Sequence, residues 1–360
     1  MTPHINRIGT AVPEHDVHLP FLAFARTLLA DDRARMVFDR MAERSGIAHR
    51  YSGFRPGCLA AGEVDAEGFY KRSAFPSTAG RMRLYEPLAR ALSLKAVAAL
   101  DIDAERDRIT HVVVASCTGF TAPGLDLQLA AALQLPASVG RTLIGFMGCS
   151  AAVPALRVAC DAVRADPLAR VLVVNCELST LHLQETSDLE TVLSFMLFAD
   201  GASAALVTAD PVGLAVDDFR SVIVPDSAGL ITWHIGDQGF DMHLSGKVPG
   251  RIATVLRSEI EGDGPGILHG EGTQAYDLWA VHAGGRTVLD AVEIGLALDP
   301  QALRHSRKVL HDFGNMSSAT IMFALARILA ARDGERGLGM AFGPGMVAET
   351  FRFRRAAAAA

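Results

Sequence analysis

The sequence predicts an α/β protein built around mostly parallel sheets. Short apolar segments rich in Val, Ile and Leu alternate along the chain with longer helical patterns. Several apolar segments show no polar alternation, which is typical of strands covered on both faces. Half of the 360 residues are hydrophobic, enough for a large core, and only 21% are charged, which predicts that a partner subunit covers part of the surface.

Six segments have the apolar, β-branched composition of strands, and five have helical periodicity. The predicted strands are His111–Ser116, Thr142–Phe146, Arg170–Cys176, Ala202–Val207, Leu278–His282 and Leu338–Phe342. The predicted helices are Leu125–Leu133, Ser150–Ala165, Asp188–Phe198, Gly284–Leu298 and Ser317–Ala331. Ser187 and Glu190 match a capping box with the serine as cap, and Ser317 and Ser318 are predicted caps of the last helix. The helix 150–165 is apolar on nearly every face, so we expect it to be buried.

The strand and turn pattern divides the chain into two parts. A turn, Asp210-Pro211-Val212-Gly213, follows the strand at 202–207, so we expect a first unit over 1–210 and a second over 211–355. We expect the alanine run 356–360 to be a disordered tail. The sequence contains no short-period repeat, and a two-fold likeness of the halves cannot be demonstrated from it.

Charge and cysteine usage exclude several classes of protein. The net charge is −6 and no long basic run occurs, which argues against nucleic-acid binding. No apolar segment has transmembrane length and no signal-peptide pattern occurs, so we expect a cytoplasmic protein. The five cysteines form no C-x-x-C pair, predicting reduced thiols, and neither a metal-ligand spacing nor a phosphate-binding loop is evident.

Cys149 stands between Gly148 and Ser150, where a predicted strand gives way to the buried helix. A thiol at a helix N-terminus meets unpaired N–H groups and the positive end of the helix dipole, and both favour the reactive thiolate. A backbone N–H of the same turn could also donate to an oxyanion. The alternative is a buried structural cysteine, since free cysteine is commonly buried. The local sequence leaves both interpretations open.

A cysteine nucleophile needs a base or a cationic neighbour. His282 ends a predicted strand and precedes Ala-Gly-Gly, a position where α/β folds place functional groups; His182, His234 and His243 compete with it. Asn315 precedes the last predicted helix, where asparagine usually caps or turns the chain but can also donate to an oxyanion. From the neighbouring sequence alone, a structural role is the more common interpretation for both His282 and Asn315.

Together these contexts resemble one family, the type III polyketide synthases (chalcone synthase-like enzymes). The resemblance rests on ordered motifs from near residue 40 to near residue 352. The main ones are Gly-Phe-Met-Gly-Cys-Ser-Ala-Ala-Val-Pro-Ala-Leu-Arg at 145–157, Trp-Ala-Val-His-Ala-Gly-Gly at 279–285, Gly-Asn-Met-Ser-Ser at 314–318 and Phe-Gly-Pro-Gly-Met-Val-Ala-Glu-Thr at 342–350. Further matches are 116–124, 197–201 and 224–227. Each motif is weak alone, whereas the ordered set is specific.

The resemblance implies a thiolase-like fold of two similar α/β halves, a homodimer, acyl-CoA and malonyl-CoA as substrates, and no cofactor or metal. It implies that Cys149 accepts the acyl group, that His282 pairs with it as thiolate and imidazolium, and that Asn315 is a second oxyanion donor. Condensation by decarboxylation of malonyl-CoA, followed by cyclisation to a pyrone, resorcinol or phloroglucinol, is the implied reaction. These roles agree with the chemistry expected from the residue types.

The resemblance also places substrate-contacting residues. Phe198 matches a gatekeeper between the CoA tunnel and the cavity, and Met242 stands where a second gatekeeper phenylalanine is usual. The small Ala122 and the flexible Met242 predict a wider cavity and a fatty acyl starter. The remaining expected cavity residues are Cys117, Ser179, His182, Ser317 and Pro344. Arg50 is the expected contact for CoA phosphates.

Two other functions remain open at this stage. One is a ketoacyl-ACP synthase III-like enzyme that carries out a single condensation; such enzymes usually show His-Gln-Ala-Asn, whereas Ala-Gly-Gly follows His282 here. The other is a non-catalytic relative that binds acyl-CoA, against which the intact Cys, His and Asn set argues.

Overall fold

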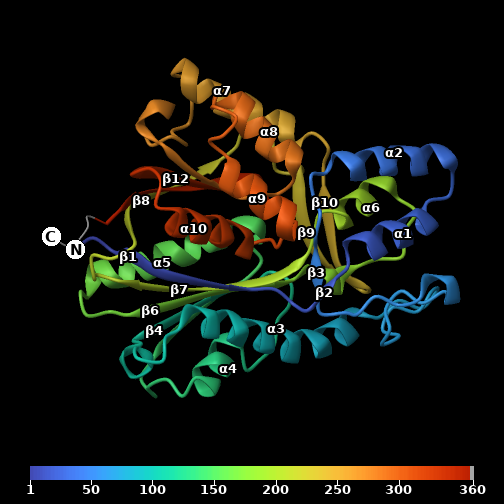
Figure 1. Cartoon of the computed structure of the whole chain (residues 1–360), viewed down its shortest axis with the longest axis horizontal. Coiled ribbons are helices and arrows are strands. Elements are labelled where there is room, and N and C mark those ends of the chain that lie inside the picture. Colours follow the sequence, from blue (N-terminus) through green and yellow to red (C-terminus); the bar gives the residue numbers. More distant parts are fainter. Residues whose placement is uncertain (357–360) are drawn as a thin grey trace.

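The computed structural model describes residues 1–356, and within them a single nine-stranded sheet organises the chain (Figure 1). Its strand order is β11-β12-β13-β8-β1-β7-β6-β4-β5. Two small two-stranded sheets, β9 with β10 and β2 with β3, lie beside it. The expected α/β fold is therefore confirmed, with the sheets of the two halves joined through β1 and β8. Of the expected tail at 356–360, residues 357–360 lie outside the described residues.

The observed strands and helices have the following bounds. The strands are β1 (His4–Ala11), β2 (His15–Asp16), β3 (Tyr51–Ser52), β4 (His111–Ala115), β5 (Gly140–Ile144), β6 (Val171–Leu178), β7 (Asp200–Thr208), β8 (Leu214–Ile223), β9 (Ile231–Gly236), β10 (Gly239–Leu244), β11 (Leu278–Val281), β12 (Arg336–Gly343) and β13 (Val347–Arg355). The helices are α1 (His18–Leu28), α2 (Asp32–Arg44), α3 (Thr78–Leu100), α4 (Leu125–Ala132), α5 (Ala152–Ala165), α6 (Leu189–Phe195), α7 (Val248–Glu261), α8 (Arg286–Gly295), α9 (Arg304–Phe313) and α10 (Ala319–Ala331).

Strand direction changes across the sheet. The outer pairs β4–β5, β4–β6 and β11–β12 are parallel, as expected for strands connected through helices. The inner pairs β6–β7, β7–β1, β1–β8, β8–β13 and β13–β12 are antiparallel. The sequence pattern does not reveal this change, because central strands covered on both faces are apolar in either direction.

The two halves repeat one topology. In the first half the order β4-β6-β7-β1 has one parallel pair followed by two antiparallel pairs, and β11-β12-β13-β8 has the same sequence of directions. Each half also places a helix directly before its second strand of this series, α5 before β6 and α10 before β12. The likeness of the halves, invisible in the sequence, is a property of the fold, and α5 and α10 are equivalent helices.

The helices form layers on the sheet (Figure 1). Helices α3 and α4 cover the outer face of the first half, and α7, α8 and α9 cover that of the second. Helices α5 and α10 lie between the halves and share one core cluster with strands of both. The predicted burial of α5 is confirmed for its inner face, which includes Val153, Leu156 and Cys160. No helix within residues 1–356 combines the length and apolar character needed to cross a bilayer.

Two predicted helix caps are wrong. Helix α6 begins after Asp188, whose carboxylate accepts the Thr191 N–H at 2.8 Å, so Asp188 and not Ser187 is the cap. Neither Ser317 nor Ser318 caps α10 with its side chain. The Ser318 hydroxyl donates instead to the buried carboxylate of Glu177. Local spacing predicted the serines, but an acidic side chain nearer the helix start and a tertiary acceptor displaced them.

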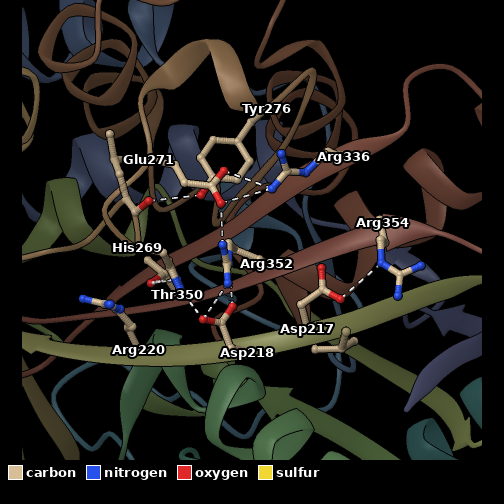
Figure 2. A network of polar contacts seen from close by, with 12 residues as sticks. Asp217, Asp218, Arg220, His269, Glu271, Tyr276, Arg336, Thr350, Arg352 and Arg354 are labelled. Atoms are coloured by element: carbon tan, nitrogen blue, oxygen red, sulfur yellow. Dashed lines mark hydrogen bonds and ion pairs between the residues drawn. The ribbon is translucent and has the colours of Figure 1, made fainter. Parts of the chain in front are cut away.

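A network of charges fastens the segment between α7 and β11 to the sheet (Figure 2). Arg352 of β13 binds both oxygens of Asp218 on β8, at 2.6 and 3.0 Å, and reaches Glu271 at 2.5 Å. Glu271 also accepts from Arg336 of β12. His269 lies against Asp218 at 3.1 Å. The hydrogen bonds that Arg352 donates to Asp218, together with the negative charges of Asp218 and Glu271, raise the pKa of Arg352 above its ordinary value.

We expect Arg352→Met to lower the free energy of unfolding by about 2 kcal/mol, because Asp218 and Glu271 lose a charged donor. Arg354→Met on the same strand removes one exposed pair with Asp217 and should cost less than about 1 kcal/mol. Urea unfolding followed by circular dichroism measures both. Equal losses in the two variants would show that the network adds nothing beyond an exposed ion pair.

Candidate active site

An apolar cavity of about 60 Å³ at the junction of the halves contains the three residues expected to react. Cys149 lies in the short 3₁₀ turn Gly148–Ser150 before α5, and Asn315 lies just before α10. His282 follows β11, where its backbone N–H continues the ladder to Met340 of β12 at 2.8 Å. The equivalent helices α5 and α10 therefore begin at one cavity, and their starts bring together side chains that are 166 positions apart in the sequence.

The turn that carries Cys149 requires glycine. Gly148 has a φ of +61°, in the left-handed region, and a Cβ built on it would lie 2.5 Å from the Pro344 ring. Pro344, predicted to shape the cavity, lines it and packs on this turn. The backbone at Cys149 is therefore held between the start of α5 and the turn at the end of β12.

Burial dominates the ionisation of the site. It raises the pKa of the Cys149 thiol to about 11, although hydrogen bonds from Ser317 and Asn315 act in the opposite direction. Burial alone lowers the pKa of His282 to about 3, and neither ring nitrogen has a hydrogen-bond partner among the described residues. Burial therefore outweighs the effect that the helix dipole was expected to have on the Cys149 thiol. Proton transfer from sulfur to imidazole creates both charges together and leaves the net charge of the cavity unchanged.

Asn315 is fixed by the protein on both sides of its amide. Its Oδ1 accepts the Ser317 N–H at 2.8 Å and its Nδ2 donates to the Gly284 carbonyl at 3.1 Å. Its backbone N–H donates to Leu197 O at 2.8 Å, in a bridge beside Phe198. One amide hydrogen thus anchors the group, and the other is available to Cys149 or to an oxyanion.

Glu177, which the sequence analysis did not identify, is buried near Cys149. Its Oε2 accepts the Cys117 N–H and the Thr118 hydroxyl, each at 2.9 Å, and its Oε1 accepts the Ser318 hydroxyl. Burial raises its pKa to about 7. This carboxyl connects the end of β6, the segment after β4 and the start of α10. The signal available in the sequence was a charged residue, Glu177, directly after the apolar segment 170–176.

Most expected substrate-contacting residues line the cavity. Those present are Phe198, Met242, Cys117, Ser179, Ser317 and Pro344. Phe198 and Ser179 also border a second apolar chamber. Cys117 is buried, and burial raises the pKa of its thiol well above the ordinary value, which fits a wall position.

His182 does not line the cavity, contrary to expectation. Its Nδ1 accepts the Phe240 N–H at 2.9 Å, so its Nε2–H donates to Thr118 O at 2.7 Å. The ring stacks on Phe240 with centroids 4.2 Å apart, and burial lowers its pKa to about 3. With both nitrogens occupied, His182 is a structural residue that holds β10 against the segment after β4.

Ala122 and Arg50 also lie elsewhere than expected. Ala122 is exposed in the loop after β4, outside the cavity of its own chain. Arg50 is buried, and its Nη1 donates to the carbonyls of Phe195 and Phe198 at 2.9 and 2.6 Å. Burial lowers the pKa of Arg50 to about 9. Arg50 Nη2 has no hydrogen-bond partner among the described residues, but the side chain is buried and lines neither the cavity nor its outer groove.

Trp233 is the second site residue that sequence reasoning missed. It stands opposite Met242 in the β9–β10 hairpin and lines the cavity. Its Nε1–H donates to Cys117 O at 3.1 Å, and its ring meets His182 and Phe240 edge-on. The indole and the Met242 side chain are therefore neighbouring parts of the same cavity wall.

A solvent-facing groove of about 1130 Å³ adjoins the cavity. The two share Leu244, Val248, Gly284 and Val288 as lining residues. Arg44 and Arg286 line the groove and are exposed, unlike Arg50. Three carboxylates, Asp188, Glu190 and Asp290, also line the groove, and Asp290 lies 3.6 Å from Arg286.

Solved structures of the same architecture identify the class of this protein. The structure of PKS-I from the brown alga Ectocarpus siliculosus superimposes with a TM-score of 0.86 at 29% identity, covering 98% of each chain. The type III polyketide synthase domain of 'Steely1' from Dictyostelium matches the fold with a TM-score of 0.87 at 22% identity over 99% of this chain and 100% of that one. The fold is thus the thiolase-like fold of type III polyketide synthases, which are condensing acyltransferases.

Sequence comparisons then show the family. Residues 3–211 match the N-terminal domain of chalcone and stilbene synthases, and residues 217–357 match the C-terminal domain. Bisdemethoxycurcumin synthase of Oryza sativa subsp. japonica is 35% identical over 334 residues, covering 87% of this chain and 81% of that protein. The chain belongs to the chalcone and stilbene synthase family.

We expect Ser317→Ala to raise the pKa of Cys149 by about half to one unit, because a hydrogen bond to the sulfur of about 1 kcal/mol is lost. The pH dependence of iodoacetamide alkylation at Cys149, read by peptide mass spectrometry, measures the shift. Ser317 has a φ of +49°, so Ser317→Gly removes the hydroxyl without strain and should shift the profile equally. An unchanged profile in both variants would contradict the hydrogen bond.

Proposed function

We propose that this protein condenses an acyl-CoA starter with malonyl-CoA and cyclises the product, with Cys149 as nucleophile. One observation carries the proposal: Cys149, His282 and Asn315 meet in one apolar cavity that adjoins an open groove. A thioester carbonyl needs a soft nucleophile, and a dry site strengthens every donor aimed at a developing negative charge.

The proposed reaction has two parts, acylation of Cys149 and condensation with malonyl-CoA. Cys149 Sγ attacks the starter carbonyl, His282 takes the thiol proton, and CoA leaves with a proton as its free thiol. Malonyl-CoA then loses CO₂, and the resulting enolate oxygen receives hydrogen bonds from His282 and Asn315. The enolate carbon attacks the acyl group on Cys149, a carbon–carbon bond forms, and the sulfur of Cys149 is released. Repetition followed by ring closure yields a pyrone, resorcinol or phloroglucinol.

Substrate binding follows from the groove and its cations. We assign the phosphates of CoA to Arg44 and Arg286 in place of Arg50, since both are exposed and line the groove. A fatty acyl starter remains the proposed substrate. The reaction as written requires no cofactor or metal.

The association of two copies is supported by the surface beside the active site. Strand β5 is an edge of the sheet, and four large apolar side chains near it are about 40% exposed: Phe120, Leu127, Leu143 and Met147. Ala122 lies in the same loop as Phe120 and so belongs to this surface. We propose that the protein is a cytoplasmic homodimer whose interface covers this apolar surface. We also propose that the boundary between the two halves of the chain lies near residue 210.

The proposal predicts that Cys149→Ala abolishes both acyl-enzyme formation and product, because Cys117, the other thiol lining the cavity, is a buried wall residue whose pKa burial raises well above its ordinary value. Purified enzyme is incubated with malonyl-CoA and acyl-CoA starters from acetyl to dodecanoyl and aromatic, and intact-protein and product masses are read. Normal product from Cys149→Ala would remove it from the mechanism and make Cys117 the next candidate.

Asn315→Ala should reduce malonyl-CoA decarboxylation about 100-fold and starter loading far less, since loss of one oxyanion donor costs about 3 kcal/mol. Release of CO₂ and acylation of Cys149 are measured separately. Equal losses in the two half-reactions would show that Asn315 supports the nucleophile generally and not the enolate.

A further inference from the structure

The outward face of helix α2 combines cations with apolar side chains. Its residues recur at the spacing of one helical stripe, about 140° wide. All six are exposed, and three are arginines: Arg33, Met36, Val37, Arg40, Met41 and Arg44. The opposite side of the helix is buried, since Phe38 packs into a core cluster with side chains of α1 and α6. These six exposed residues are called the α2 face below.

The arginines of the α2 face form no salt bridge within residues 1–356, whereas the acidic residues of the same helix are mostly paired. Asp32 pairs with Arg35. Asp39 pairs with Arg26 of α1. Only Glu43 borders the face without such a pair. Since the whole chain has a net charge of −6, the α2 face is a local basic surface on an acidic protein.

The apolar members of the α2 face lie between its cations. Met36 is 64% exposed, Val37 37% and Met41 39%. A single exposed apolar side chain is ordinary, but three on one stripe of a helix leave a surface that a partner protein would cover. Cations around an apolar centre specify a partner that carries acidic side chains around an apolar contact of its own.

The α2 face leads to the active site. Its last two members, Met41 and Arg44, line the groove that adjoins the cavity of Cys149. Helix α2 lies beside α1 and α6 at one edge of the molecule (Figure 1). A partner bound on the α2 face therefore stands at the mouth of the groove, in position to extend an arm toward Cys149.

The groove suits a thioester donor with few charges. Its lining contains two arginines and three carboxylates: Arg44, Arg286, Asp188, Glu190 and Asp290. CoA brings a diphosphate and a 3′-phosphate to this mouth. The phosphopantetheine arm of an acyl carrier protein ends in the same pantetheine thioester but brings a single phosphodiester. The carrier arm thus places less negative charge against the three carboxylates than CoA does.

We propose that the α2 face docks an acidic acyl carrier protein, whose arm enters the groove and delivers the starter to Cys149. The inference rests on the proposed function and names the donor of the starter, while malonyl-CoA remains the extender. Cys149 Sγ attacks the carrier thioester, and the bond from the acyl carbon to the arm sulfur breaks. The arm then leaves as a thiol, with the proton that His282 took from Cys149.

An anionic membrane surface is the other kind of partner that a basic and apolar helix face can bind. Membrane-surface helices anchor themselves with Trp, Phe and Leu, and the α2 face contains none of these residues. The position of the face at the groove mouth also serves a carrier arm, which must reach Cys149, and has no corresponding use for a bilayer. The carrier protein is therefore the favoured partner.

The test uses the full-length enzyme, malonyl-CoA and an octanoyl starter in two forms. One is octanoyl-CoA, and the other is an octanoyl-loaded acyl carrier protein of bacterial fatty acid synthesis. Product mass gives kcat/KM for each donor. Arg33→Glu and Met36→Glu alter the α2 face at positions that do not line the groove. Arg90→Glu on α3 is the matched control, since Arg90 is exposed and forms no salt bridge among residues 1–356.

We expect both variants to lose kcat/KM about tenfold or more with the octanoyl carrier protein, and less than about threefold with octanoyl-CoA, because only the carrier contacts the whole α2 face. Arg90→Glu should match the wild type with both donors. Raising the salt from about 50 to about 300 mM should reduce the wild-type rate with the carrier and narrow its difference from the variants. Thermal unfolding confirms that each variant is folded.

Three results would overturn the docking assignment: product from octanoyl-CoA but none from the carrier, unchanged carrier rates in both variants, or an equal loss in Arg90→Glu. Flotation with phosphatidylglycerol vesicles tests the other partner. Vesicle binding that Arg33→Glu abolishes, together with an unchanged carrier rate, would assign the α2 face to a membrane. Absence of product from both donors would instead contradict the proposed function itself.

Discussion

The active site depends on one constraint, the packing of two equivalent buried helices between the halves. Helices α5 and α10 share a core with strands of both halves, and both begin at the same cavity. The carboxyl of Glu177 fastens this junction, since it binds the start of α10 through Ser318 and the segment after β4 through Cys117 and Thr118. Because the helix starts are placed by the core, Cys149 and Asn315 are held in place without long loops of their own.

Burial then determines the chemistry that this placement permits. A dry cavity disfavours a lone thiolate and a lone imidazolium, as the pKa values of Cys149 and His282 show. The same dryness favours a pair of opposite charges formed together, and it strengthens hydrogen bonds to an enolate. Reactivity is thus coupled to the presence of a partner charge, whether the imidazolium or the developing oxyanion. Ser317 and Asn315 reduce the cost by donating to the sulfur.

The sequence predicted those parts of the fold and site that local patterns encode. All six predicted strands and five predicted helices exist, and Cys149, His282 and Asn315 meet in one cavity, because each sits at the end of a recognisable element. The repeat of the halves was not predictable, since it is preserved in strand order and direction alone. The roles of His182 and Arg50 failed for another reason: whether a buried polar group faces a substrate or a backbone carbonyl depends on tertiary partners.

The cavity shows why substituting one side chain does not predict substrate size. Met242 was expected to open space, and Trp233, which pairs with it across the β9–β10 hairpin, lines the same cavity. Interiors are close-packed, so volume removed at one position is commonly refilled from the facing strand. The backbone of Phe198, whose side chain lines the same cavity, is fixed by the hydrogen bond that Arg50 donates to its carbonyl. The space in such a cavity therefore depends on facing and neighbouring side chains together, and not on the residue at one position alone.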